Sequence, residues 1–218
     1  MEAKSFAELA MERLSSMTLV SEEETQAREQ KEREEQKQKA YENSGVGRRY
    51  WNLTMDDFRE TPENAENRKA ISDYIGSKSM DNLWMVGATG TGKTFLGAMI
   101  IRELGGVYVK SYQLINDVLM SASYSAKESV NEIVNRYAGY RRLVIDEVGK
   151  SGNKDTEVNI LWQILNERYE NELPTVMISN LSKADLANYL GGHIVYRFAG
   201  CTKALVFTGD SWRQNGGD

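Results

Sequence analysis

The octapeptide GATGTGKT at residues 87–94 constrains the fold of this chain more than any other feature. It satisfies every fixed position of the pattern G-x-x-x-x-G-K-[ST], between an apolar run (82–87) and a segment of helical character (93–104). Glycines allow backbone N–H groups to curl around a phosphate, and the start of the following helix adds a favourable dipole. The motif therefore predicts a phosphate-binding loop (P-loop) that joins a buried strand to a helix.

We expect the whole loop to form an ATP site, with Mg²⁺ as the second cofactor. The Lys93 ammonium is expected to reach the β- and γ-phosphates, and the Thr94 hydroxyl to ligate the metal ion. The alternative is a glycine turn that carries a lysine by chance, and the strand–loop–helix context argues against it. The predicted nucleotide-binding residues are Gly87, Ala88, Thr89, Gly90, Thr91, Gly92, Lys93 and Thr94.

A second apolar run, LVIDE at 143–147, ends in two adjacent carboxylates. Open α/β sheets bind their ligands at the carboxyl ends of the strands, where these acids would lie. We expect Asp146 to hold Mg²⁺, directly or through water, and Glu147 to polarise the attacking water. The alternative is that both acids simply end the strand and face solvent. The adjacent pair favours an ATPase over a small-molecule kinase, because a kinase must exclude the water that Glu147 would activate.

A third strand-like run, TVMISN at 175–180, ends in Ser179 and Asn180. A polar side chain at the tip of a neighbouring strand can hold a water against the γ-phosphate. We therefore expect Asn180 to be the third catalytic element, although a strand-end asparagine can also cap the turn that follows.

Strand-like and helix-like segments alternate from residue 81 onward. Such alternation predicts a mainly parallel sheet with helices on both faces, the architecture of P-loop NTPases of the AAA+ or RecA-like type. The expected strands are 82–87, 107–110, 142–148, 175–180 and 204–209, and the expected helices are 63–77, 93–104, 112–120, 127–138, 156–171 and one ending at Leu190.

The N-terminal region has a different composition. Residues 5–17 place Phe6, Leu9, Leu14 and Met17 at helical spacing, whereas residues 21–40 are rich in charge and contain no large apolar side chain. The charged stretch is typical of a solvated helix or a disordered arm, and a helical arm that docks on a partner is the alternative. We expect a charged, helical, partner-binding region at 1–45, a linker at 46–62 and the ATPase core at 63–218.

Composition narrows the class of protein further. The single cysteine (Cys201) and single histidine (His193) exclude an internal disulfide and make a zinc site of nitrogen and sulfur ligands implausible. The formal net charge of −5 provides no global attraction to nucleic acid, so contact with DNA would need a local patch. No secretory signal or membrane span is evident, and the cytoplasm is the expected location.

Together these pieces resemble the AAA+ ATPases, and within them the DnaC-type helicase loaders and the related IstB-type transposition ATPases. The resemblance rests on GATGTGKT (87–94), LVIDEVG (143–149), TVMISNLS (175–182), LGGHIVYRFAG (190–200) and the stretch NSGVGRRYWNLTMDDF (43–58). The chain departs from the family pattern at Gly192-His193, where members often have Gly-Glu-Arg, and this weakens the expectation for contacts between subunits.

The resemblance implies further roles. Arg197 occupies the place of the family's arginine that acts on the ATP of a neighbouring subunit, which implies self-assembly; a surface charge on a short helix is the alternative. We expect a minimal or absent C-terminal helical lid, and Arg213 is a weaker candidate for reaching the phosphates. Loaders expose the region between the P-loop and the acidic strand to single-stranded DNA, and its candidates are Tyr112, Tyr124, Tyr137 and Tyr140 with Lys110, Lys127, Arg136, Arg141 and Arg142. Packing in the core or on the surface is the alternative for most of the tyrosines, and none of them is given an individual role.

The function that the sequence favours is ATP-dependent loading of a replicative DnaB-type helicase onto single-stranded DNA, in a bacterium or phage. The N-terminal region would bind the helicase. The alternatives that stay open are an IstB-like ATPase that assists a transposase, a P-loop module whose nucleotide acts only as a switch, and a metabolite kinase.

Overall fold

The computed structural model describes residues 6–123, 126–150 and 152–209, and the chain divides into two compact units, residues 1–40 and 41–218. The first unit is a single long helix, α1 (Phe6–Glu42), which runs on into the start of the second. Its described side chains from residue 24 to residue 40 are almost all exposed, as their charge predicts. The predicted apolar stripe of Phe6, Leu9, Leu14 and Met17 lies outside the described side chains. None of the described helices combines the length and apolar content needed to cross a membrane.

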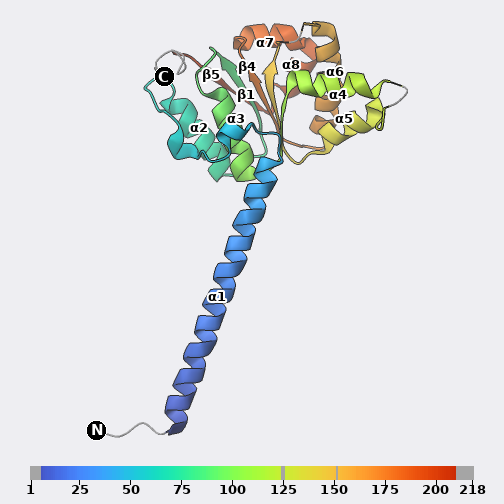
Figure 1. The fold of residues 1–218 in the computed structure, drawn as a ribbon. Coiled ribbons are helices and arrows are strands. Elements are labelled where there is room, and N and C mark those ends of the chain that lie inside the picture. The colour runs from blue at the N-terminus through green and yellow to red at the C-terminus, as the bar shows by residue number, and fades with distance from the viewer. Residues whose placement is uncertain (1–5, 124–125, 151, 210–218) are drawn as a thin grey trace. The chain divides into compact units, whose positions relative to one another are not determined.

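The second unit is built on a parallel sheet of five strands in the order β2-β3-β4-β1-β5 (Figure 1). The expected parallel sheet and its strands are thus confirmed, with boundaries shifted by a few residues. The strands are β1 (Asn82–Gly87), β2 (Val107–Lys110), β3 (Leu143–Val148), β4 (Thr175–Ser179) and β5 (Thr202–Phe207). Because β4 lies between β1 and β3, the P-loop strand and the acidic strand are not direct neighbours.

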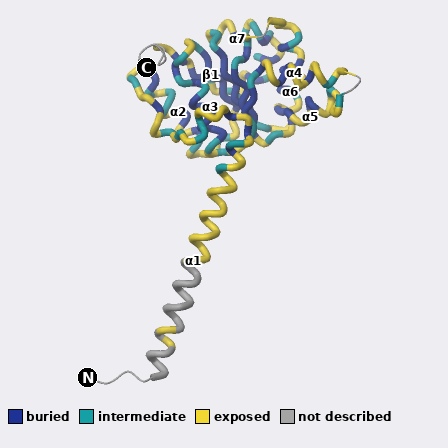
Figure 2. Tube along the Cα trace, viewed as in Figure 1, coloured by how far each residue is buried: buried dark blue, intermediate teal, exposed yellow. Residues whose placement is uncertain are grey.

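Helices cover both faces of the sheet (Figure 1). Alternate residues of β1 point to opposite faces: Leu83 and Met85 pack with α2 and α3, whereas Trp84 and Val86 belong to the cluster that α4 to α8 complete. Figure 2 shows the buried residues concentrated in the strands between these layers. The helices are α2 (Ala65–Gly76), α3 (Lys93–Leu104), α4 (Ser111–Ser121), α5 (Val130–Gly139), α6 (Lys154–Glu170), α7 (Lys183–Leu190) and α8 (Gly192–Phe198).

Residues 46–62, which we expected to form a linker, lie within the sheet-containing unit. Tyr41, Val46 and Phe58 are all buried in the cluster on the α3 face of the sheet, and the Phe58 ring lies 5.6 Å from that of Phe95 in α3. Two short 3-10 turns, Arg48–Tyr50 and Met55–Asp57, shape the segment. The structure therefore places the start of this unit at Tyr41, because the few apolar side chains from Tyr41 onward pack into the core.

Candidate functional site

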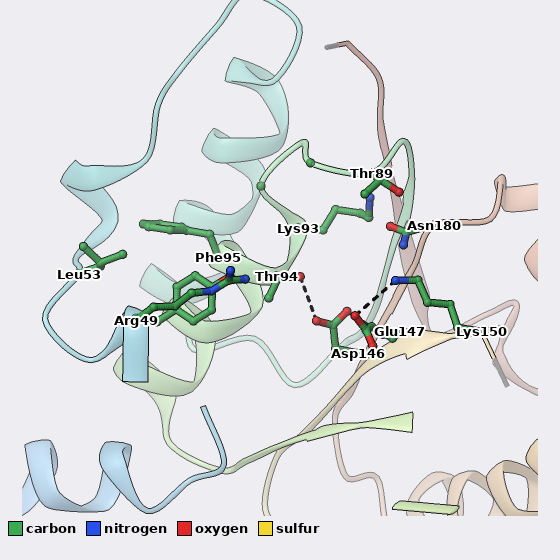
Figure 3. Close-up of a pocket in the computed structure, with 13 residues that line it drawn as sticks. Arg49, Leu53, Thr89, Lys93, Thr94, Phe95, Asp146, Glu147, Lys150 and Asn180 are labelled. Carbon is green, nitrogen blue, oxygen red and sulfur yellow. Dashed lines mark hydrogen bonds and ion pairs between the residues drawn. The ribbon is translucent and has the colours of Figure 1, made fainter. Parts of the chain in front are cut away.

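Most of the expected nucleotide-site residues line one cavity of about 300 Å³ at the carboxyl ends of the strands (Figure 3). Lys93 and Thr94 begin α3, Asp146 and Glu147 end β3, and Asn180 follows β4. Thr89, Gly90 and Gly92 of the loop line the cavity as well. The structure thus brings together, from three strands, most of the residues that the motifs predicted, while Arg197 is not among the lining residues.

Three glycines of the loop, Gly87, Gly90 and Gly92, have backbone conformations that other residues rarely adopt. Gly87 has φ of 116°, and a Cβ at this position would lie 2.2 Å from the carbonyl oxygen of Phe207 in β5. Gly92 is the N-cap of α3 with φ of 91°, in the left-handed region. These glycines let the chain reverse tightly from β1 into α3, so that the N-terminus of the helix is directed at the cavity.

Lys93 is held by backbone carbonyl groups of its own loop. Its ammonium donates to the carbonyl oxygens of Gly87 at 2.7 Å and Ala88 at 2.5 Å, and the residue is only 4% exposed. Burial lowers the pKa of Lys93 from 10.5 to about 8; the carboxylate of Asp146 opposes this change and the ammonium of Lys150 adds to it. The loop therefore holds a desolvated cation that an incoming phosphate chain would stabilise.

Asp146 and Thr94 place two oxygen atoms of the kind that ligate metal ions beside the P-loop. The Thr94 hydroxyl donates to Oδ2 of Asp146 at 2.9 Å, and the Asp146 residue is buried. Mg²⁺ usually takes one or two protein oxygens together with phosphate oxygens and water, so this pair fits the ion. Among the described residues no cluster of three or more histidines, cysteines or acids offers a different kind of metal site.

Glu147 is placed by a local irregularity at the end of β3. The pairing between β3 and β4 shifts between Ile145 and Val148, so that two residues of β3, Asp146 and Glu147, face one residue of β4. Glu147 has φ of 63°, a conformation that costs energy for a residue with a Cβ and is typical of functional sites. Its carboxylate lies 3.3 Å from the ammonium of Lys150 (Figure 3). The bulge directs both acids into the cavity instead of to alternate faces.

Asn180 reaches the site because of the strand order. It directly follows β4, and β4 lies between the P-loop strand and the acidic strand. Figure 3 shows its side chain on the same side of the cavity as Lys93 and Lys150. Its place agrees with the role that we predicted, and the role itself stays a prediction.

The other end of the cavity is apolar and aromatic, and our sequence reasoning gave its residues no role. Figure 3 shows Arg49, Leu53 and Phe95 at this end, and Tyr50 lines the cavity as well. The Tyr50 ring packs edge-on against Phe95 with centroids 6.2 Å apart, and the Arg49 guanidinium lies over the Tyr50 ring at 4.6 Å. The aromatic and basic run RRY at 48–50 was the available signal. It lies far from the P-loop in sequence, and only the fold brings it to the site.

Arg197 lies on α8 and contacts α6 of the same chain. Its guanidinium donates to the side chain of Asn166 and pairs with Glu170 at 2.9 Å. It also lies over the rings of Trp162 at 5.4 Å and Tyr169 at 5.1 Å. The inter-subunit role of Arg197 stays a prediction. Arg213 lies outside the described residues.

The DNA-facing candidates divide by exposure. Arg142 is buried and donates to Ser79 O at 2.8 Å, and Tyr137 is buried with its hydroxyl donating to Asp117 at 2.6 Å. These two side chains stabilise the fold and cannot reach a strand of DNA. The expectation for Arg142 was therefore wrong, and Tyr137 follows the packing alternative. Those that stay exposed are Tyr112, Lys127, Arg136 and Arg141, with Lys110 and Tyr140 exposed in part, while Tyr124 lies outside the described residues.

Comparisons with known proteins agree on one family. A model of the family described as IstB-like ATP binding protein matches residues 3–214. The replicative helicase loader DnaC of Escherichia coli (strain K12) is 25% identical over 198 residues, which is 86% of this chain and 80% of that protein. An insertion sequence IS21 ATP-binding protein of Pseudomonas aeruginosa is 23% identical over 150 residues, 66% of this chain and 56% of that protein.

Solved structures show the same fold. The crystal structure of a DnaC helicase loader matches with a TM-score of 0.65 and 21% identity, covering 74% of this chain and all of that one. AMPPCP-bound DnaA from Aquifex aeolicus matches with a TM-score of 0.60 and 20% identity, and this chain spans about half of its length. The second unit is therefore a P-loop AAA+ fold, as the sequence predicted.

Proposed function

This chain belongs to the family of IstB-like ATP binding proteins, and from that premise we propose that it hydrolyses ATP with Mg²⁺ to load a replicative helicase onto single-stranded DNA. The observation that carries the proposal is the cavity in which Lys93, Thr94, Asp146, Glu147 and Asn180 meet. The similarity to helicase loaders over 86% of the chain supports the choice of partner.

In this proposal the triphosphate replaces the carbonyl oxygens of Gly87 and Ala88 as the partner of the Lys93 ammonium. Thr94 and Asp146 would hold Mg²⁺, which neutralises charge that develops on the phosphates. The adenine would lie against Tyr50, Leu53 and Phe95, because flat apolar rings pack well on such side chains. Glu147 would orient and polarise the water that attacks the γ-phosphate, with Asn180 holding it from the neighbouring strand.

Replacing Lys93 by Ala is expected to weaken Mg-ATP binding by at least about 100-fold. Each charge-assisted hydrogen bond from the Lys93 ammonium to phosphate contributes about 1.5–3 kcal/mol to binding, and the substitution removes them.

The wild-type protein should take up protons when it binds Mg-ATP at pH 8.5. The pKa of Lys93 is about 8 in the free protein, and the phosphate charge raises it, so the ammonium form is restored. At pH 7 the lysine is already largely protonated and the uptake should be smaller.

Isothermal titration in buffers of different ionisation enthalpy measures both the affinity and the proton uptake. Lys154→Ala is the matched control, since Lys154 lies on α6 and does not line the cavity. If Lys93→Ala binds Mg-ATP as tightly as Lys154→Ala does, residues 87–94 are not the nucleotide site.

For the partner, we propose that α1 binds the helicase. The described side chains of α1 that precede Tyr41 are almost all exposed, and the second unit begins only at Tyr41. A long exposed helix can dock into a groove on a partner. The start of the second unit at Tyr41 also defines where the chain can be cut.

Deletion of residues 1–40 is expected to leave a folded ATPase that no longer co-elutes with its hexameric helicase. A deletion of residues 1–45 would also remove Tyr41 and Ser44, which are buried in the second unit, and should lower its stability. Size-exclusion chromatography with the helicase, paired with a thermal melt of each truncation, measures both effects. Full co-elution of the 41–218 fragment would place the helicase-binding surface on the core instead.

A second candidate is an ATPase that assists a transposase, favoured by the family model and by the IS21 relative. Affinity capture with purified hexameric helicase and with purified transposase distinguishes the two. Stimulation of turnover by single-stranded DNA favours a loader over a nucleotide switch. Phosphate release without an added acceptor excludes a metabolite kinase.

A further inference from the structure

The hydroxyl of Tyr108 contacts the carboxylate of Asp146, which is a ligand of Mg²⁺ in our proposed function. Tyr108 itself has no role in that proposal. It belongs to β2, is 6% exposed, and its hydroxyl donates to Oδ2 of Asp146. The same oxygen accepts from the Thr94 hydroxyl at 2.9 Å, and the backbone N–H of Glu147 donates to Oδ1 at 2.7 Å. Both oxygens of Asp146 are thus oriented by hydrogen bonds from three different elements.

The segment that begins the second unit contacts the backbone of Tyr108. The backbone N–H of Tyr108 donates to the carbonyl oxygen of Ser44 at 2.7 Å. The next residue, Gly45, has φ of 91°, and a Cβ there would lie 2.1 Å from the carbonyl oxygen of Tyr108. The two backbones therefore approach more closely than any residue with a side chain allows. Residues 44–45 thus fix the edge of β2 that carries Tyr108.

We propose that Tyr108 is a positioning residue for Mg²⁺: it holds Asp146 in the orientation that, with Thr94, receives the ion, and Ser44 and Gly45 fix Tyr108 in turn. This proposal rests on the proposed function, because Mg²⁺ enters there as the cofactor of ATP hydrolysis. Hydrogen bonds from outside the ligand shell fix the orientation of a metal ligand, and their loss typically weakens metal binding about 10–100-fold. The alternative is a tyrosine that only packs, for which the hydroxyl is dispensable.

Tyr108→Phe tests this, because it removes the hydroxyl and keeps the ring. The probe is a fluorescent ADP analogue, whose affinity is measured while Mg²⁺ is titrated and again in EDTA, so that no hydrolysis is involved. We expect the Mg²⁺ concentration at half effect to rise about 10-fold or more, with the affinity in EDTA unchanged. Tyr137→Phe is the matched control, since it removes another buried hydroxyl that donates to a carboxylate, Asp117, away from the cavity.

Gly45→Ala tests the second step. It should shift the Mg²⁺ titration in the same direction as Tyr108→Phe, because the added methyl group displaces the Tyr108 backbone. Gly105→Ala is its control: Gly105 also has positive φ, of 72°, but a Cβ there meets no atom within 4 Å. An unchanged titration for Gly45→Ala overturns the role of residues 44–45.

The outcomes separate this inference from the proposed function. If the nucleotide affinity of the wild-type protein does not depend on Mg²⁺, the proposed metal site is wrong, and so is the role of Tyr108. A wild-type protein that responds to Mg²⁺, together with a Tyr108→Phe titration that matches Tyr137→Phe, overturns the role of Tyr108 alone. An equal loss of affinity in EDTA and in Mg²⁺ shows that Tyr108 only supports the fold.

Discussion

Glu147→Gln is expected to bind Mg-ATP as the wild-type protein does and to hydrolyse it about 10²–10⁴-fold more slowly, the range that a positioned general base contributes. The amide has nearly the shape of the carboxylate but cannot polarise the attacking water. Because Glu147 has φ of 63° and sits in the bulge of β3, the substitution must keep the side-chain size, and Gln does so. The loss should therefore fall on the chemical step and not on the fold.

Phosphate release under saturating Mg-ATP gives the rate, and titration calorimetry gives the affinity. Glu172→Gln is a matched control, since Glu172 also has positive φ, of 52°, and does not line the nucleotide cavity. Wild-type turnover by Glu147→Gln would remove Glu147 from the mechanism and leave a different group, or none, to activate water.

Arg197→Ala is expected to lower hydrolysis by up to about 10³–10⁵-fold while a single subunit still binds ATP. An arginine supplied to the γ-phosphate from a neighbouring subunit stabilises the charge of the transition state by that factor in related hydrolases. Arg197 does not line the cavity of its own chain, so this effect requires assembly. The specific activity of the wild-type protein should accordingly rise with protein concentration, or with DNA that gathers subunits.

A structural role for Arg197 must be separated from this one, because its ion pair with Glu170 joins α8 to α6. Glu170→Ala breaks that ion pair and keeps the arginine. If the contact only stabilises the fold, Glu170→Ala should reproduce the lower thermal stability and the lower rate of Arg197→Ala. If Arg197 acts across an interface, Glu170→Ala should keep the rate, since the guanidinium is still present and loses only one of its contacts within the chain.

Mixing two inactive variants provides the direct test. In a mixed assembly, the pocket of an Arg197→Ala subunit keeps its Glu147 and faces the intact arginine of a Glu147→Gln subunit. Such interfaces should restore part of the activity. A mixture that stays inactive, together with a rate that depends on neither protein nor DNA concentration, would favour a monomeric nucleotide switch.

The residues that we assign to the phosphates could be located from local sequence. Residues 87–94 are consecutive, so the loop, the positive φ of its glycines and the start of α3 follow from one motif. The five strands could also be located, because buried parallel strands are short apolar runs bounded by turns. Asp146 and Asn180 could be named as candidates for the same reason, since each lies at the end of such a run.

The sequence by itself thus determined the fold class, the P-loop and the candidate acids, since each depends on neighbours a few residues apart. Only the tertiary structure decided what distant segments do. It placed β4 between β1 and β3, made the bulge that directs Glu147, and packed residues 41–58 against α3, where Tyr50 and Leu53 complete the cavity. It also buried Arg142, whose guanidinium donates to the Tyr74 hydroxyl and to the carbonyl oxygen of Ser79. Exposure, strand order and the partner of a charged side chain depend on contacts between residues far apart in the chain, and no local pattern encodes those contacts.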